Sequence, residues 1–215
     1  LPVSLLPLVA GLGTALLAAP LGWLSTRKAG TPFAMITLGL GELAWALALM
    51  FPSLFGGEGG VSVDRVIGPA PWGISFGPPM QLYGLIAAYT LLATLLVHLF
   101  GRTTLGTLLL AVRENPLRVG FLGYDARTLR WLAFVFSAFL AGVSGGLAAL
   151  LFEVVTPESL GTARSGALLL FCVLGGGGLL AGPVLGGVLM VLALVGLSSL
   201  TPAWMLYMGL AFVLV

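Results

Sequence analysis

Long apolar runs joined by short polar connections dominate the pattern of this chain. A helix needs about 20 consecutive apolar residues to cross a bilayer, and four runs before residue 153 reach or approach that length. Glycines interrupt the apolar sequence that follows, and Thr201-Pro202 is expected to turn the chain into a last span. The four predicted membrane spans are residues 1–24, 33–55, 81–100 and 131–152.

Composition excludes a soluble domain. Hydrophobic residues make up 59% of the 215 residues and charged residues only 7%, whereas soluble domains carry about 25% charged residues. Mean hydropathy is +1.15. The predicted fold class is therefore an all-α, polytopic helical membrane protein with glycine-broken or re-entrant segments. We expect a single transmembrane domain over residues 1–215, belonging to a longer polypeptide, and the single cysteine, Cys172, can form no intrachain disulfide.

The long connection between residues 101 and 130 is plainly basic. It holds five of the nine basic residues and two acids, so the positive-inside tendency places it in the cytoplasm. Arg27 and Lys28 mark a second cytoplasmic turn, which leaves segments 56–80 and 153–165 outside. The net charge of +2 is a topology signal, and no nucleic-acid partner is expected. The basic residues of the loop are Arg102, Arg113, Arg118, Arg127 and Arg130.

Two short helices are predicted within this loop, at residues 105–112 and 116–122. Asn115 can cap the second helix, Pro116 suits its first position, and Gly123 suits a left-handed stop. The second helix is amphipathic enough to lie at a membrane face and touch a soluble partner. A solvated loop whose arginines only fix the topology is the alternative interpretation.

The fourth span begins and packs in a recognisable way. Asp125 and Thr128 can act as local caps at its start. Small residues then recur at helical spacing, which allows close contact between helices inside lipid. The two stripes are Ser137-Ala141-Gly145 and Ala138-Gly142-Gly146.

The middle of the second span is unusual, because Gly39 and Gly41 precede a carboxylate, Glu42. The glycines predict a break in the helix. An ionised side chain at mid-bilayer costs roughly 2.5–3.5 kcal/mol, so Glu42 should face the interior of a helix bundle or have a partner. It either lines a translocation pathway or is hydrogen-bonded to its surroundings, for example through Thr37.

Four consecutive glycines follow residue 174, beginning with Gly175 and Gly176. They predict either a re-entrant segment or an uncharged inner turn, and they either admit substrate beside bare backbone or allow close packing. Segments 33–42 and 165–178 enter the membrane from opposite sides with glycine interruptions, as inverted-repeat transporters do. Two glycine-containing spans can also match by chance.

These features favour transport over catalysis. A membrane enzyme needs convergent titratable groups, yet the chain offers a single intramembrane acid, one histidine (His98) and no phosphate-binding loop. No metal-ligand spacing occurs around His98, and no cofactor is expected. An ion-coupled secondary transporter using Glu42 remains an alternative, as does a purely structural membrane subunit.

Several segments, in order along the chain, resemble the permease subunit of bacterial ABC importers for branched-chain amino acids. The basic loop and fourth span carry the resemblance most strongly, and the second span with its outer loop and the late glycine-proline region add to it. The matching segments are Ala111–Asp125, Arg130–Leu147, Phe33–Glu42 with Gly56–Gly60, and Leu174–Gly187.

The resemblance implies a multi-pass permease subunit of the bacterial inner membrane that moves branched-chain or related apolar amino acids into the cytoplasm. It implies a second permease subunit, cytoplasmic ATPase subunits that hydrolyse ATP in its place, and a periplasmic substrate-binding protein as partners. Loop 101–130 would be the cytoplasmic coupling loop. Its coupling residues would be Arg113, Glu114, Asn115, Pro116, Arg118, Gly120 and Gly123, and pathway candidates are Gly39, Gly41, Glu42, Gly175 and Gly176.

Overall fold

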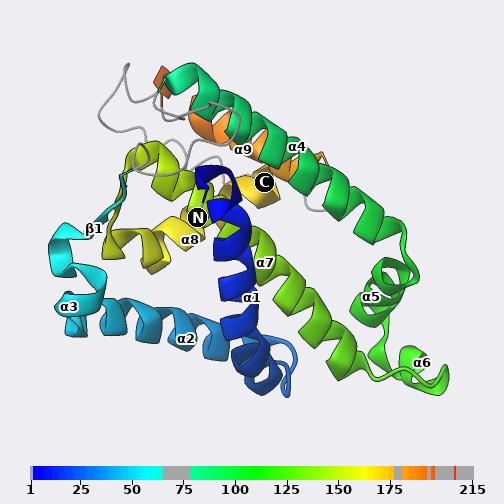
Figure 1. The fold of residues 1–215 in the computed structure, drawn as a ribbon. Helices are drawn as coiled ribbons and strands as arrows, with labels where there is room; N and C mark the ends of the chain where they lie inside the picture. The colour runs from blue at the N-terminus through cyan, green and yellow to red at the C-terminus, as the bar shows by residue number, and fades with distance from the viewer. Residues whose placement is uncertain (1, 65–77, 177–180, 193–194, 197–205, 207–215) are drawn as a thin grey trace. The chain divides into compact units, whose positions relative to one another are not determined.

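Helices make up almost all of the computed structural model, which describes residues 2–64, 78–176, 181–192, 195–196 and 206 (Figure 1). Four helical segments are long and apolar enough to cross a membrane, which confirms the all-α, polytopic prediction. Two compact units divide the chain, Leu1–Pro157 and Glu158–Val215. The candidate spans are Val3–Ser25, Thr31–Met50, Pro79–Arg102 and Ala126–Phe152.

The first unit contains all four candidate spans together with a small two-stranded ribbon. A short 3-10 turn, η4 (Pro157–Leu160), follows it in the chain. In order along the chain, the elements of the first unit are η1 (Val3–Leu5), α1 (Leu6–Ser25), α2 (Thr31–Met50), α3 (Pro52–Phe55), η2 (Gly57–Gly59), β1 (Val61–Ser62), α4 (Pro79–Arg102), α5 (Thr104–Glu114), α6 (Pro116–Phe121), α7 (Ala126–Phe152) and β2 (Val154–Val155).

The helix pair α1–α7 forms the core of this unit, and the two helices lie side by side in Figure 1. Glycines allow their backbones to meet. A Cβ atom at Gly142 would overlap the Thr14 hydroxyl and lie 2.9 Å from the Gly11 Cα. A Cβ at Gly146 would lie 2.9 Å from the Pro7 Cα. Small residues therefore permit the close approach that drives helix association where lipid removes the hydrophobic force.

Only one of the two predicted small-residue stripes serves this contact. Gly142 and Gly146 are buried against α1, which confirms the second stripe. Ser137, Ala141 and Gly145 are exposed, and among the described residues no atom lies within 4 Å of a Cβ built at Gly145. The first stripe is therefore not a packing face within the described chain, because it lies on a side of α7 that α1 does not cover.

Helix α4 contacts η1 and α7. Near its start, Leu82 is buried in a cluster with Val3 and Leu150. Near its end, the Phe100 ring stacks on the Phe136 ring with centroids 4.3 Å apart. Tyr89 adds a hydrogen bond from its hydroxyl to the Ser4 carbonyl oxygen at 2.5 Å. These contacts join the third predicted span to the first and fourth.

The ribbon joins the two segments that were predicted to lie outside. Strand β1 pairs antiparallel with β2, with Val61 opposite Val155 and Ser62 opposite Val154. The Val63 amide then donates to the Glu153 carbonyl oxygen at 2.8 Å. The ends of the second and fourth spans thus lie together, as the positive-inside topology requires.

Helix α2 does not break at Gly39 or Gly41, so that prediction was wrong. A single glycine costs a helix only about 1 kcal/mol, whereas a broken helix in lipid would leave several backbone groups unsatisfied. The interruption comes instead after Met50, where Phe51 leaves helical geometry and Pro52 begins α3.

The second unit holds two shorter apolar helices, α8 (Thr162–Leu174) and α9 (Gly182–Leu192). With 13 and 11 residues they measure about 20 and 16 Å, less than the roughly 30 Å hydrocarbon thickness. Helix α8 ends at the glycines, and Gly176 has a φ of +99°, so the predicted interruption here is confirmed. The remaining two glycines of the run and the Thr201-Pro202 turn lie outside the described residues.

Candidate coupling surface and pathway residues

The basic loop contains the two predicted helices, each with a side-chain cap. Asn115 accepts hydrogen bonds at its Oδ1 from the backbone amides of Leu117 at 3.1 Å and Arg118 at 3.3 Å. Thr103 caps α5 in the same way through Gly106, at 3.3 Å. Pro116 in the first turn of α6 removes an amide that would otherwise lack a partner. The sequence prediction of α6 and its cap is confirmed.

The turn from α6 into α7 is equally well specified. Gly123 has a φ of +85°, the left-handed geometry predicted for the helix stop. Asp125 caps α7 by accepting from the Arg127 amide at 3.0 Å and from the Thr128 hydroxyl at 2.8 Å. The hydrogen bond from Thr128, with that from the Arg127 amide, lowers the pKa of the Asp125 carboxyl. Asp125 is therefore held as a carboxylate at the positive end of the α7 dipole.

A small apolar cluster fixes α6 to both of its neighbours. Val112 of α5, Val119 of α6 and Leu129 of α7 are buried against one another, and Val119 is only 1% exposed. A six-residue helix has little stability of its own. The caps and this cluster therefore make α6 part of a firm platform between two spans.

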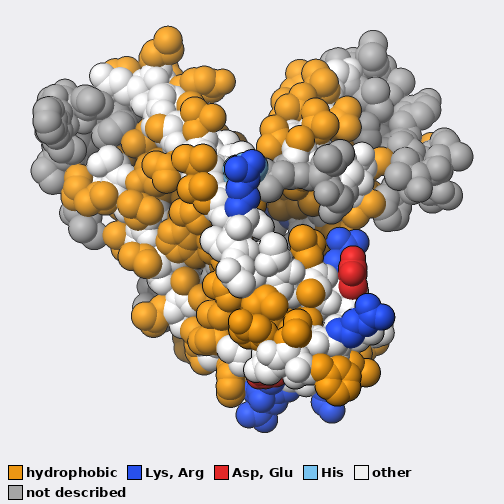
Figure 2. Space-filling model, turned by 90° about the vertical axis from the view of Figure 1, so that its right-hand side faces the viewer, with side chains coloured by type: hydrophobic (Ala, Val, Ile, Leu, Met, Phe, Trp, Pro, Cys, Tyr) orange, Lys and Arg blue, Asp and Glu red, His pale blue; other side chains and the backbone are white. Residues whose placement is uncertain are grey.

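The opposite side of the platform is exposed and mixed in character. Leu117 is 74% and Phe121 is 90% exposed, and Arg113 and Arg118 are exposed beside them. Figure 2 shows basic side chains interspersed with hydrophobic ones over the lower part of this face. We call Arg113, Leu117, Arg118 and Phe121 together the α5–α6 surface. Large exposed apolar groups rimmed by charge are typical of a protein-binding surface.

The other predicted coupling residues lie in the same segment. Glu114, Pro116, Gly120 and Gly123 are exposed, whereas Asn115 is half-buried because of its capping role. Among the described residues no atom lies within 4 Å of a Cβ built at Gly120. The fold thus brings all seven predicted residues into one short segment.

Sequence reasoning missed a cluster at the inner ends of α1 and α7. The Arg127 guanidinium carbon lies 4.0 Å from the centre of the Trp23 ring, and Arg127 Nη2 donates to the Trp23 carbonyl oxygen at 3.2 Å. The Trp131 ring meets the Trp23 ring edge-on, with centroids 5.9 Å apart, and its Nε1 donates to the Ala19 carbonyl oxygen at 2.7 Å. The signal in the sequence that could have indicated this cluster is a tryptophan near the end of each of the two spans, because tryptophan is enriched at the membrane interface.

This cluster also places the two basic segments at one end of the helix pair. Arg27 and Lys28 follow the Trp23 end of α1, and loop 101–130 precedes the Trp131 end of α7. Arg130 is engaged within its own helix, since its Nε donates to the Ala126 carbonyl oxygen at 3.0 Å. The arrangement agrees with a common cytoplasmic side for both segments.

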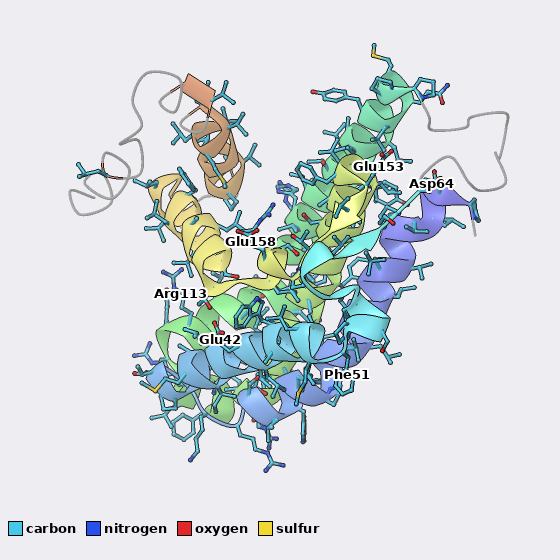
Figure 3. The ribbon with its side chains drawn as sticks, turned by 90° about the vertical axis from the view of Figure 1, so that its left-hand side faces the viewer. Glu42, Phe51, Asp64, Arg113, Glu153 and Glu158 are labelled. Atoms are coloured by element: carbon cyan, nitrogen blue, oxygen red, sulfur yellow. The ribbon has the colours of Figure 1, made fainter. Side chains whose placement is uncertain are left out.

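The pathway candidates on α2 are all exposed within the described chain, with Gly39 and Glu42 three residues apart on one side of the helix. Gly39, Gly41 and Glu42 are exposed, and Figure 3 shows Glu42 on the middle of this helix. Among the described residues, no atom lies within 4 Å of a Cβ built at either glycine. The sequence suggested the Thr37 hydroxyl as a partner for Glu42. In the structure this hydroxyl donates a hydrogen bond to the Phe33 carbonyl oxygen at 3.1 Å.

The glycines of the second unit behave differently. A Cβ at Gly175 would overlap the Gly182 carbonyl oxygen, and one at Gly186 would overlap the Phe171 carbonyl oxygen. Gly175 therefore serves close packing of α8 against α9. Gly176 serves the turn through its positive φ.

Four membrane-length helices, with two capped helices between the third and the fourth, define a polytopic helical membrane protein. The family model described as branched-chain amino acid transport system / permease component matches residues 1–215. The chain therefore belongs to this permease family, and it is a multi-pass protein of the bacterial cytoplasmic membrane rather than an enzyme.

Two curated relatives support the same family. The chain is 29% identical over 206 residues to the high-affinity branched-chain amino acid transport system permease protein LivM of Escherichia coli K12, covering 86% of this chain and 48% of the relative. It is 30% identical over 209 residues to LivM of Salmonella typhimurium LT2, covering 87% and 49% respectively. The chain thus spans about half the length of these relatives. No solved structure matches it.

Proposed function

We propose that this chain is the translocating part of a permease subunit in an ATP-driven importer, which carries branched-chain or related apolar amino acids into the cytoplasm. The α5–α6 surface is the observation that carries the proposal. It combines the exposed Phe121 and Leu117 with arginines on a platform that joins two membrane spans. The likeness to LivM supports the substrate class, since that relative is named for branched-chain amino acids.

In this proposal a cytoplasmic ATPase subunit binds the α5–α6 surface. Phe121 and Leu117 would enter an apolar groove, while Arg113 and Arg118 meet acidic groups at its rim. Closure of two ATPase subunits on ATP displaces α6, and the Val119 cluster passes that displacement to α5 and α7. The spans then rock and expose the substrate path alternately to the two sides of the membrane.

The proposal includes two further partners. A second permease subunit would cover the exposed sides of α2, because only 6% of this span is buried within the described chain. A periplasmic binding protein would deliver the amino acid at the end of the unit that carries the β1–β2 ribbon, where Asp64 and Glu153 lie close together (Figure 3).

The translocation path in this proposal runs along the side of α2 that carries Gly39 and Glu42. Gly39 and Gly41 leave the backbone beside Glu42 uncovered within the described chain, so a small amino acid could pass close to it. Glu42 would then meet the ammonium group of the substrate. Gly175 and Gly176 of the second unit are separate pathway candidates, and packing and turn geometry fix their local backbone.

Uptake of radiolabelled leucine tests the proposal. The complete permease, its partner subunits and the binding protein are reconstituted in vesicles, and uptake with ATP is compared with uptake driven by an imposed ion gradient. We expect uptake to require ATP and to be lost when Arg113 and Arg118 are both replaced by Glu, because charge reversal disrupts the docking surface. Uptake driven by the gradient without ATP, and abolished by Glu42→Gln, would establish a secondary carrier instead.

A further inference from the structure

The inner ends of α1 and α7 are joined by more than close packing. A Cβ at Gly22 would lie 2.5 Å from the Phe134 ring and one at Gly11 would lie 2.6 Å from a Val143 methyl group. The Phe134 ring and a Val143 methyl group therefore fill the spaces that these two glycines leave on α1. Such packing holds two helices at a fixed separation and rotation.

Side chains also cross from one helix to the backbone of the other at three heights. The Thr14 hydroxyl reaches the Ala138 carbonyl oxygen at 3.0 Å, in the space that Gly142 leaves open. Trp131 reaches the Ala19 carbonyl oxygen and Arg127 reaches the Trp23 carbonyl oxygen. Each of these bonds depends on the register of α1 against α7.

Arg127 lies at the point where the coupling segment enters this helix pair. Its backbone amide is bonded to the Asp125 cap, and its guanidinium lies over the Trp23 ring. Leu129, two residues later, packs on Val119 of α6 in the buried cluster. A displacement of α6 would therefore act on the start of α7, where Arg127 contacts α1.

We infer that Arg127 is a positioning residue that makes α1 and α7 move as one rigid body, so that movement of α6 is passed through Trp23 to α1. The inference rests on the proposed function. The planar guanidinium stacks on the Trp23 indole and donates to the Trp23 carbonyl oxygen at the same time. A lysine ammonium keeps the charge but lacks this planar geometry.

The chain offers a matched control for the test. Arg130 lies almost one turn after Arg127 on the same helix, and its guanidinium bonds the Ala126 carbonyl oxygen of α7 itself. Arg130→Lys and Arg127→Lys both keep the positive charge that fixes topology. Of the two, only Arg127→Lys removes a bond from α7 to α1.

The first readout is the number of leucine molecules taken up per ATP hydrolysed by the reconstituted importer. We expect Arg127→Lys to lower this ratio about five-fold, the factor that corresponds to the loss of one hydrogen bond, while the amount of assembled complex stays unchanged. Trp23→Leu should lower it similarly, and the double variant should be no worse than either single one. Arg130→Lys should keep the native ratio.

The second readout does not depend on transport. Spin labels are attached at Leu24→Cys and Leu132→Cys, two exposed positions on α1 and α7, in a full-length permease whose native cysteines, Cys172 included, are replaced. The distance between the labels should stay constant with and without nucleotide in the native background. The distribution of distances between the two labels should broaden in Arg127→Lys and stay narrow in Arg130→Lys.

The inference is overturned if the label distance changes with nucleotide in the native background, or if Arg127→Lys matches Arg130→Lys in both readouts. It is also overturned if total uptake falls only in proportion to lost complex while uptake per ATP stays at the native value. Absence of ATP-dependent uptake by the native importer would contradict the proposed function. In that case the label distances would still test whether α1 and α7 form a rigid pair.

Discussion

Gly142 shows how one residue sets the distance between two membrane helices. Its missing side chain leaves room for the Thr14 hydroxyl and brings α7 within contact of the Gly11 backbone. Backbone atoms cannot move aside as a flexible side chain can. The stability of the α1–α7 pair should therefore depend on this position far more than on Gly145, which α1 does not cover.

We predict that Gly142→Ala lowers the free energy of unfolding of the full-length permease by about 1–3 kcal/mol, the usual cost of overpacking. Unfolding by heat or SDS in detergent, followed by circular dichroism, measures the change. Gly145→Ala is the matched control, because a Cβ there meets nothing within 4 Å in the described chain. Equal effects of the two substitutions would contradict the observed packing.

Asp125 should give the start of α7 a dependence on pH. Its pKa is lowered in the folded protein by the Thr128 hydroxyl and the Arg127 amide. The unfolded chain therefore binds the proton more tightly, so the stabilisation is complete above the ordinary aspartate pKa near 4 and is lost as pH falls through the lower folded value.

We predict that Asp125→Ala destabilises the permease at neutral pH and that its deficit relative to the native protein shrinks on acidification below about pH 4. Thermal unfolding of both proteins between pH 7 and pH 3 provides the comparison. A deficit that stays constant across this range would show that the carboxylate charge plays no part in capping.

Helix α6 is an element whose existence depends on its caps and its anchor. Asn115 holds two amides at its start, and Val119 fixes it from beneath. We predict that Asn115→Ala costs about 1 kcal/mol locally and makes the Leu117 and Arg118 amides exchange about five-fold faster. Hydrogen exchange read by mass spectrometry measures this. Asn115→Asp, which retains a capping oxygen, should exchange at the native rate, and faster exchange in that variant would argue against the cap.

The same elements show what the sequence can predict. Short-range signals succeeded: Asn115, Gly123 and Asp125 marked the ends of α6 and α7, because a cap involves only residues within one turn. Apolar length located the spans. The break at Gly39 and Gly41 was predicted wrongly, since a glycine permits an interruption without requiring one, and the bilayer favours an unbroken helix.

The sequence did not predict contacts between residues that are far apart along the chain. Two small-residue stripes on α7 were equally periodic, and only the position of α1 decides that Gly142 packs while Gly145 does not. The Trp23–Arg127 contact joins residues 104 positions apart, so no local pattern indicates it. The basic loop was identified as a topology signal, yet Arg127 also holds two helices together.

At the scale of the molecule, the two ends of the first unit have distinct characters. One end gathers the turn after α1 and the α5–α6 platform, with most of the basic residues. The other joins the segments after α2 and α7 in the β1–β2 ribbon. This polarity matches a membrane protein whose basic end faces the cytoplasm, which is the orientation that the proposed function needs.

The most direct test of this account is a photo-crosslinking amino acid placed at Phe121, the more exposed of the two apolar residues of the α5–α6 surface, in the assembled importer. The matched control carries the same probe at Leu95, an exposed position in the middle of α4. The account predicts that the probe at Phe121 captures the ATPase subunit and that the probe at Leu95 does not, as mass spectrometry of the products would show. Capture only of lipid or of another permease subunit from Phe121 would contradict the central claim that this surface couples ATP hydrolysis to transport.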